Sequence, residues 1–323
     1  MSVPDTYHGD DLFAGVEMGG TKCVCTLAHG PDSILEQRSF PTNSPAETLP
    51  ALAATLADWT ERFPLRAIGV AAFGPICLNP ADPRYGHILA TNKAGWRDVD
   101  VLGALAVSPT LPIGFDTDVN GAALAEMRWG SGRGLQDYAY VTVGTGVGVG
   151  LIVNGRATRG IGHSEIGHIR VPRLPGDGLE SVCRYHSDCV EGLASGSALV
   201  ARLHGRAVRD VGSDDPVWKP IVATLAAMCH ALVATTGPQR IAIGGGVPSG
   251  QPHLLPRIEA ELERSLGGYI DLAGHKPYIV PPQLGERAGP LGAVALAIDA
   301  AARHKAALHP ARDLRCGFTA TPI

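Results

Sequence analysis

Short apolar runs that stop at glycine turns recur along the chain. Residues 13–18 form one such run, which ends at Gly19-Gly20-Thr21-Lys22 and resumes over residues 23–28. Residues 138–150 repeat this plan around Gly144-Thr145-Gly146. Two apolar runs joined by a glycine turn are typical of a β-hairpin. The pattern therefore predicts two hairpins of the same design, one in each half of the chain.

Three further apolar runs, which we expect to be strands, end in glycine or acidic residues. The runs and their ends are residues 67–73 with Gly74-Pro75, residues 113–115 with Asp116-Thr117-Asp118, and residues 240–243 with Gly244-Gly245-Gly246. Strands that end in this way tend to place their last residues at the edge of a cleft. We therefore expect these ends to face a common cleft.

Helical spacing follows several of the apolar runs. Ser44 as N-cap, Pro45 in the first turn and Glu47 as the partner in a capping box predict a helix that continues to Trp59. Further helices are expected at residues 120–129, from about 198, and at 218–236, 254–266 and 292–303. Residues 164–192 lack periodicity and are rich in Gly, Pro, His and Cys, so we expect an inserted loop there.

These elements predict two related α/β domains that meet near Thr117 without a flexible linker. A length of 323 residues suits two domains that share a cleft. The tail beyond Ala307 has little pattern, and we expect it to be loosely held.

Composition narrows the class of protein. A net charge of −4 and scattered positive residues disfavour nucleic acid as a partner. The N-terminus carries no secretion signal and no long uncharged apolar run is present, so we expect a cytoplasmic protein without a membrane partner. The cysteines number 7, an odd count that argues against a secreted disulfide framework.

The glycine turns are candidates for phosphate binding, because their backbone amides and hydroxyls can face one anion. Gly19-Gly20-Thr21-Lys22, Gly144-Thr145-Gly146 and Gly244-Gly245-Gly246 are together a stronger signal than any one alone. The alternative is that they serve only as ordinary turns. A Walker A pattern is absent from the sequence, so a P-loop enzyme is excluded.

The segment Asp116-Thr117-Asp118-Val119-Asn120 lies between a predicted strand and a predicted helix. A hydroxyl attacks phosphorus only if a base accepts its proton, and a carboxylate at the mouth of a cleft suits that role. The alternative is that an Asp here caps the helix.

The loop holds a candidate metal centre. His168, Cys183, His186 and Cys189 make a tetrahedral ligand set of the kind that zinc prefers. A site with four protein ligands has no open position, so its role is structural. The alternative is a pair of buried free cysteines with unrelated histidines.

Carboxylates stand beside these ligands. Glu165 and Glu191 can each accept hydrogen bonds from sugar hydroxyls, although solvated surface charge is the alternative for either residue. Gly74, in the turn Phe73-Gly74-Pro75, is a candidate for a wall of the same pocket.

The motifs resemble those of the ROK family (repressors, open reading frames, kinases), and in particular its bacterial fructokinase branch. The similar segments, which run in order from about residue 13 to residue 300, are 17–22, 73–75, 115–120, 143–146, 163–168 and 183–196. The resemblance implies the actin-like, hexokinase-like fold with two ribonuclease H-like domains around a central cleft. The small domain is residues 1–117, completed by the C-terminal helix 292–305, and the large domain is residues 118–291 with the zinc loop 163–192.

The resemblance also implies roles for single residues. Asp118 matches the general base, and the glycine turns match the phosphate loops, with Gly244 to Gly246 near the adenosine. The positions at or beside the sugar are Asp116, Asn120, Glu165, His168 and Glu191, where His168 is also a zinc ligand. The implied cofactors are ATP, magnesium (Mg2+) held mainly by phosphates and water, and structural zinc (Zn2+).

The implied reaction is ATP-dependent phosphorylation of a free hexose, D-fructose to fructose 6-phosphate, by a homodimer. Residues 91–96 read Thr-Asn-Lys-Ala-Gly-Trp, where that branch usually has two prolines. The His163-Ser164-Glu165 segment favours fructose over glucose, and mannose, glucose and N-acetylmannosamine remain alternatives. A non-catalytic sugar-responsive regulator is a remote alternative, because only about a dozen residues precede the first hairpin, too few for a helix-turn-helix domain.

Overall fold

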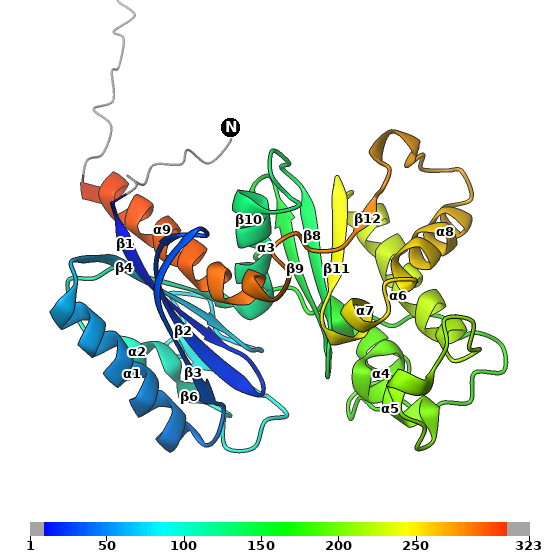
Figure 1. Cartoon of the computed structure of the whole chain (residues 1–323), viewed down its shortest axis with the longest axis horizontal. Coiled ribbons are helices and arrows are strands. Elements are labelled where there is room, and N and C mark those ends of the chain that lie inside the picture. The colour runs from blue at the N-terminus through cyan, green and yellow to red at the C-terminus, as the bar shows by residue number, and fades with distance from the viewer. Residues whose placement is uncertain (1–9, 309–323) are drawn as a thin grey trace, which may run out of the picture.

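The computed structural model describes residues 10–308, in which two five-stranded sheets each have helices on their faces (Figure 1). The first sheet has the order β3-β2-β1-β4-β7, and the second has the order β10-β9-β8-β11-β12. The first is built from β1 (Leu12–Met18), β2 (Lys22–Gly30), β3 (Ser33–Pro41), β4 (Leu65–Ala72) and β7 (Ile113–Thr117). The second is built from β8 (Tyr138–Val143), β9 (Val147–Val153), β10 (Arg156–Ala157), β11 (Arg240–Gly244) and β12 (Ile279–Val280).

The two sheets share one strand plan. In each, a hairpin and a third antiparallel strand stand on one side, and two parallel strands continue the sheet on the other. A short pair, β5 (His87–Ile88) with β6 (Val99–Asp100), lies outside both sheets. The predicted repetition of the hairpin plan is therefore confirmed, whereas the edge strand β3 was missed because its residues are mostly exposed and polar.

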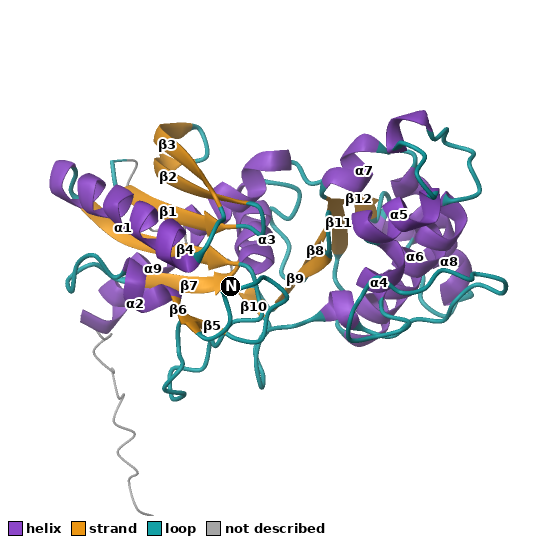
Figure 2. Ribbon diagram, turned by 90° about the horizontal axis from the view of Figure 1, so that it is seen from below, coloured by secondary structure: helices purple, strands orange, loops and turns teal. Residues whose placement is uncertain are grey.

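Helices cover the sheets as shown in Figures 1 and 2. Their bounds are α1 (Pro45–Arg62), α2 (Val101–Leu105), α3 (Asp118–Trp129), α4 (Val190–Ala194), α5 (Gly196–Leu203), α6 (Trp218–Thr235), α7 (Gly246–Gly250), α8 (Leu254–Leu266) and α9 (Ala288–Leu308). Single 3-10 turns occur at Ile166–His168, Val208–Asp210, Ala273–His275 and Gly285–Arg287. By length and composition α6 is apolar enough to cross a membrane, but 56% of it is buried inside the molecule.

A row of glycines lets α9 lie directly on the first sheet. Gly15, Gly69 and Gly114 are register partners on β1, β4 and β7. A Cβ on any of them would clash with α9, whose backbone passes over this row. The C-terminal helix thus returns to the first sheet, although it begins at Ala288, four residues before the predicted start at 292.

The start of α1 follows the predicted chemistry only in part. Ser44 is the N-cap and Pro45 begins the helix, but the Ser44 side chain makes no cap hydrogen bond. The predicted capping box with Glu47 is therefore wrong. Thr48 takes over part of this role, since its Oγ1 accepts a hydrogen bond from the Asn43 backbone N–H at 3.0 Å.

A buried carboxylate ties α3 to the segment that precedes α9. Glu126 is fully buried, and its oxygens accept hydrogen bonds from the backbone N–H groups of Gln283 at 3.1 Å and Leu284 at 2.7 Å. It also accepts a hydrogen bond from the Ser131 N–H at 2.7 Å, just beyond the end of α3.

The predicted domain division at Thr117 stays a prediction, because α3, which begins there, contacts both sheets and α9. The predicted loose tail after Ala307 lies outside the described residues apart from Leu308.

Candidate active site

Two cavities meet at the N-terminus of α3. The larger has a volume of about 1130 Å³ and the smaller about 920 Å³. Three residues line both, namely Asp118, Val119 and Thr142. The junction therefore places one carboxylate, that of Asp118, within reach of molecules in either cavity.

Asp118 has the electrostatics of a proton acceptor near neutral pH. Burial raises the pKa of its carboxyl to about 7, and the charges of Glu17 and Glu165 act in the same direction. Its Oδ1 accepts a hydrogen bond from the Val119 N–H at 2.9 Å, which opposes the rise in pKa. The predicted alternative role as helix cap falls to the neighbouring Thr117, whose side chain accepts from the Asn120 N–H.

Glu17 is a functional candidate that the sequence analysis did not single out. It lines the larger cavity with Lys22 and Asp118. Burial raises the pKa of Glu17 to about 7, and the charge of Lys22 acts against that rise. A carboxylate inside an apolar strand, just before a glycine turn, was the signal that could have identified it.

The glycine turns border the two cavities differently. Gly20, Thr21 and the turn Gly144 to Gly146 line the smaller cavity, whereas Lys22 and the triplet Gly244 to Gly246 line the larger one. Gly19 lines neither: its N–H donates to the Lys22 carbonyl at 3.0 Å and closes the hairpin. All three turns therefore surround the junction at Asp118.

The smaller cavity is formed by both halves of the chain, and charged side chains lie among its lining residues. Glu165, His168 and Glu191 line it from one side and Gly74 from the other. A Cβ on Gly74 would lie 3.2 Å from His163 Cε1 and 3.4 Å from Glu165 Oε1, so glycine leaves room for these side chains.

Asp116 and Asn120 lie behind the cavity surface. Both are almost fully buried, and neither is among the residues that line the cavities. Asp116 Oδ1 accepts hydrogen bonds from the Thr117 N–H at 2.7 Å and from Asn120 Nδ2 at 2.8 Å. Its Oδ2 pairs with Arg159, a residue that the sequence reading missed. The structure thus brings Asp116 and Asn120 together as a buried pair.

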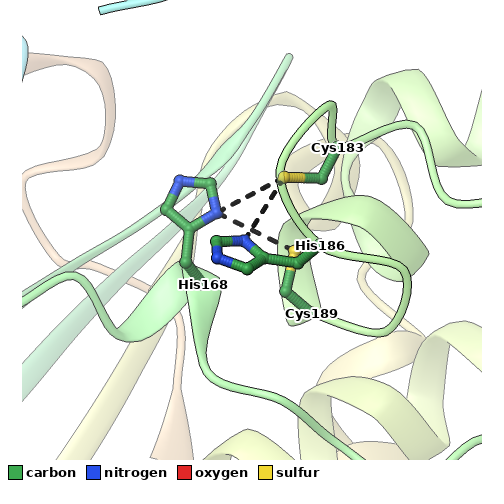
Figure 3. Close-up of side chains that lie close together, drawn as sticks. All are labelled: His168, Cys183, His186 and Cys189. Atoms are coloured by element: carbon green, nitrogen blue, oxygen red, sulfur yellow. Dashed lines mark hydrogen bonds between the residues drawn. The ribbon is translucent and has the colours of Figure 1, made fainter. Parts of the chain in front are cut away.

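The four predicted metal ligands converge (Figure 3). Their ligand atoms all lie within 4.8 Å of one another. Cys183 Sγ is 3.8 Å from His168 Nδ1 and 3.6 Å from His186 Nδ1, and Cys189 Sγ is 3.8 Å from His168 Nδ1. Tetrahedral zinc with ordinary bond lengths separates sulfur and nitrogen ligands by about 3.6 Å. The arrangement therefore fits a zinc ion with no open position.

The cluster touches the cavity through one of its ligands. His168 uses Nδ1 toward the cysteines, and its Nε2 is 3.9 Å from Glu191 Oε1. The other oxygen of Glu191 accepts a hydrogen bond from the Val147 N–H at 3.1 Å, beside the second glycine turn. Glu191 thus links the metal ligands to the turn.

The larger cavity has a wall that sequence reasoning did not find. Leu255 and Glu259 of α8 line it together with Pro281 and Pro282, which follow β12. Glu259 Oε2 accepts hydrogen bonds from the backbone N–H groups of Tyr278 at 3.1 Å and Ile279 at 2.9 Å. No local motif marks these residues, because they come from segments that meet only in the folded chain.

Comparison with known proteins decides the family, because the protein-family model described as "ROK family" matches residues 13–300 of the sequence. The chain belongs to the ROK family. A fructokinase from Pediococcus pentosaceus is 40% identical over 286 residues, which are 88% of this chain and 97% of that protein. The predicted family is therefore confirmed.

Solved structures support the fold of this ROK protein. A ROK hexokinase from Thermus thermophilus superposes with a TM-score of 0.72 at 29% identity, covering 88% of this chain and 97% of the other. A ROK family glucokinase from Streptomyces griseus, in complex with glucose and AMPPNP, gives a TM-score of 0.70 at 28% identity, covering 89% and 99%. The predicted actin-like, hexokinase-like fold is confirmed.

Proposed function

We propose that this ROK protein is an ATP-dependent fructokinase that converts D-fructose to fructose 6-phosphate. The observation that carries the proposal is the meeting of the two cavities at Asp118. The larger cavity receives ATP and the smaller one the sugar, so the γ-phosphate and the sugar hydroxyl approach each other beside this carboxylate. The fructokinase relative and the two structural neighbours support the same class of reaction.

In the proposed reaction Asp118 acts as general base. Its carboxylate accepts the proton of the sugar hydroxyl while that oxygen forms a bond to the γ-phosphorus, and the bond from phosphorus to the bridging oxygen of ADP breaks. The backbone amides of the glycine turns donate to phosphate oxygens and stabilise the charge that develops. Magnesium bound with ATP supplies further positive charge at the phosphates.

The sugar is held by side chains of the smaller cavity. Glu165 and Glu191 accept hydrogen bonds from its hydroxyls, and His168 lies beside them. Zinc bound by His168, Cys183, His186 and Cys189 would have a structural role. It would fix the segment 163–192, which carries both Glu165 and Glu191. Kinases for mannose, glucose or N-acetylmannosamine are the alternatives within the family.

The test is ATP turnover with magnesium in the presence of fructose, mannose, glucose or N-acetylmannosamine, with the position of the new phosphate determined by NMR. We expect the highest kcat/KM with fructose and phosphate on its 6-hydroxyl. A higher kcat/KM for another hexose assigns the protein to that sugar, and the absence of turnover with every sugar contradicts the kinase proposal.

A further inference from the structure

We propose that Arg159 is a positioning residue for the sugar, acting across the cleft through Asp116. This inference rests on the sugar site proposed above. Arg159 follows β10 of the second sheet, and its guanidinium Nη2 donates to Oδ2 of Asp116, which ends β7 of the first sheet with Thr117. The Arg159 side chain is 42% exposed and that of Asp116 is 3% exposed, so the pair joins a partly exposed arginine to a buried carboxylate.

Arg159 completes a hydrogen-bonded set that orients Asn120. The other oxygen of Asp116 is taken by the Thr117 N–H and by Asn120 Nδ2. Because the amide nitrogen of Asn120 faces Asp116, its Oδ1 faces elsewhere, and this buried atom has no partner among the described residues. A buried acceptor without a donor costs free energy unless a ligand or water supplies one. The set therefore fixes the orientation of a buried acceptor two residues beyond Asp118, directly behind the residues that line both cavities.

The segment that carries Arg159 also carries residues of the sugar side. His163, four positions later, accepts a hydrogen bond at Nε2 from the Ile76 N–H of the first half of the chain at 3.0 Å. Glu165 follows and lines the smaller cavity. Between the two contacts, Ile161 is fully exposed, so packing does not hold this stretch. Within the described part of the chain, the side chains of Arg159 and His163 thus make the polar contacts that attach residues 159–163 to the first half of the chain.

Loss of Arg159 should therefore lower kcat/KM for the sugar more than it changes the KM for the nucleotide. Without it, Asp116 is left buried and without its countercharge, so the carboxylate that orients Asn120 is no longer held in place. The segment before Glu165 also loses one of its contacts. A displacement of about 1 Å at reacting groups can cost about a hundredfold in rate. The larger cavity has no lining residue from this segment.

The experiment compares Arg159→Gln, Arg159→Lys and the control Arg156→Gln in steady-state kinetics with fructose and ATP varied separately. Arg156 is an exposed arginine of β10 whose side chain makes no hydrogen bond or ion pair within residues 10–308, so it matches the chemistry of the change. We expect Arg159→Gln to lower kcat/KM for fructose by about tenfold to a hundredfold with KM for ATP unchanged. Arg159→Lys should recover part of the loss, and Arg156→Gln should behave as wild type.

A double variant separates positioning from folding. In Asp116→Asn with Arg159→Gln the buried charge is removed together with its partner, so the double variant should be no less active than Asp116→Asn alone. Equal kinetics of wild type and Arg159→Gln overturn the inference. So does an equal loss for fructose and ATP that Lys does not restore and that accompanies a lower melting temperature. If the wild type phosphorylates no sugar, the proposed function itself fails, which is a different result.

Discussion

The two cavities that meet at Asp118 are built from different kinds of structure. The larger is walled by regular elements, including α8 and the ends of β11 and β12, which belong to a continuous apolar core. The smaller is walled by turns and by the irregular segment from His163 to Glu191. The first wall is stabilised by burial, whereas the second depends on a few polar contacts and on the four-residue cluster. Substitutions in the two walls should therefore have different effects on the two ligands.

The largest difference is expected when the metal cluster is broken. Cys183→Ser removes one ligand of four, so zinc should be lost and Glu191 and His168 should lose their fixed positions. We expect kcat/KM for fructose to fall by at least about a hundredfold while the affinity for AMPPNP changes little. Metal content by mass spectrometry, kinetics and calorimetry measure these effects.

Cys77→Ser is the matched control, because Cys77 is buried but lies outside the cluster. It should retain both zinc and activity. A wild-type protein that is purified without zinc and is fully active, or a Cys183→Ser variant that keeps its activity, contradicts the structural role of the cluster.

A substitution in the wall of the larger cavity should affect the nucleotide instead of the sugar. Glu259→Ala leaves the backbone N–H groups of Tyr278 and Ile279 without their acceptor, so the contact between α8 and β12 weakens. We expect KM for ATP to rise by roughly tenfold and the free energy of unfolding to fall by about 1.5–3 kcal/mol, with KM for fructose unchanged.

Glu261→Ala is the control for this change, since Glu261 lies on the same helix and, among the residues that the structure describes, pairs with Arg264 alone. Denaturant unfolding and kinetics should show it close to wild type. A rise in KM for fructose that equals the rise for ATP in Glu259→Ala would mean that the two walls are not independent.

The smallest expected effect concerns the group shared by both cavities. The base form of Asp118 is needed, and its pKa is raised to about 7, so kcat/KM for fructose should rise with pH up to about 7 and fall about tenfold per unit below it. Glu17 adds to this rise in pKa, so Glu17→Gln should move the acid limb to lower pH by less than about one unit. A limb that stays in place or disappears in this variant contradicts the assignment to Asp118.

The predictable parts of the site are those marked by short motifs. Cys183, His186 and Cys189 lie within one short stretch, and the glycine turns interrupt apolar strands, so local sequence identified both. The repeated hairpin plan likewise predicted the two sheets.

Contacts between distant segments were beyond local patterns. Arg159 and Asp116 are 43 residues apart. Glu259 accepts a hydrogen bond from the Ile279 N–H of β12, which lies 20 residues later in the chain. The placement of Asp116 and Asn120 behind the cavity was also not evident from the sequence. A motif shows which residues are polar, but it does not show whether their side chains point into the cavity or away from it. Likewise, only the folded chain shows that the row Gly15, Gly69 and Gly114 receives α9.

The most direct test of the central claim is a comparison of binding and turnover in Asp118→Asn. Calorimetry should show fructose and AMPPNP bound with affinities within a few-fold of wild type, because the amide preserves the shape of the junction. Turnover should fall by about 10²- to 10⁴-fold, because an amide cannot accept the hydroxyl proton. An Asp118→Asn variant that binds both ligands and retains wild-type turnover would contradict the role of Asp118 as the base between the two cavities.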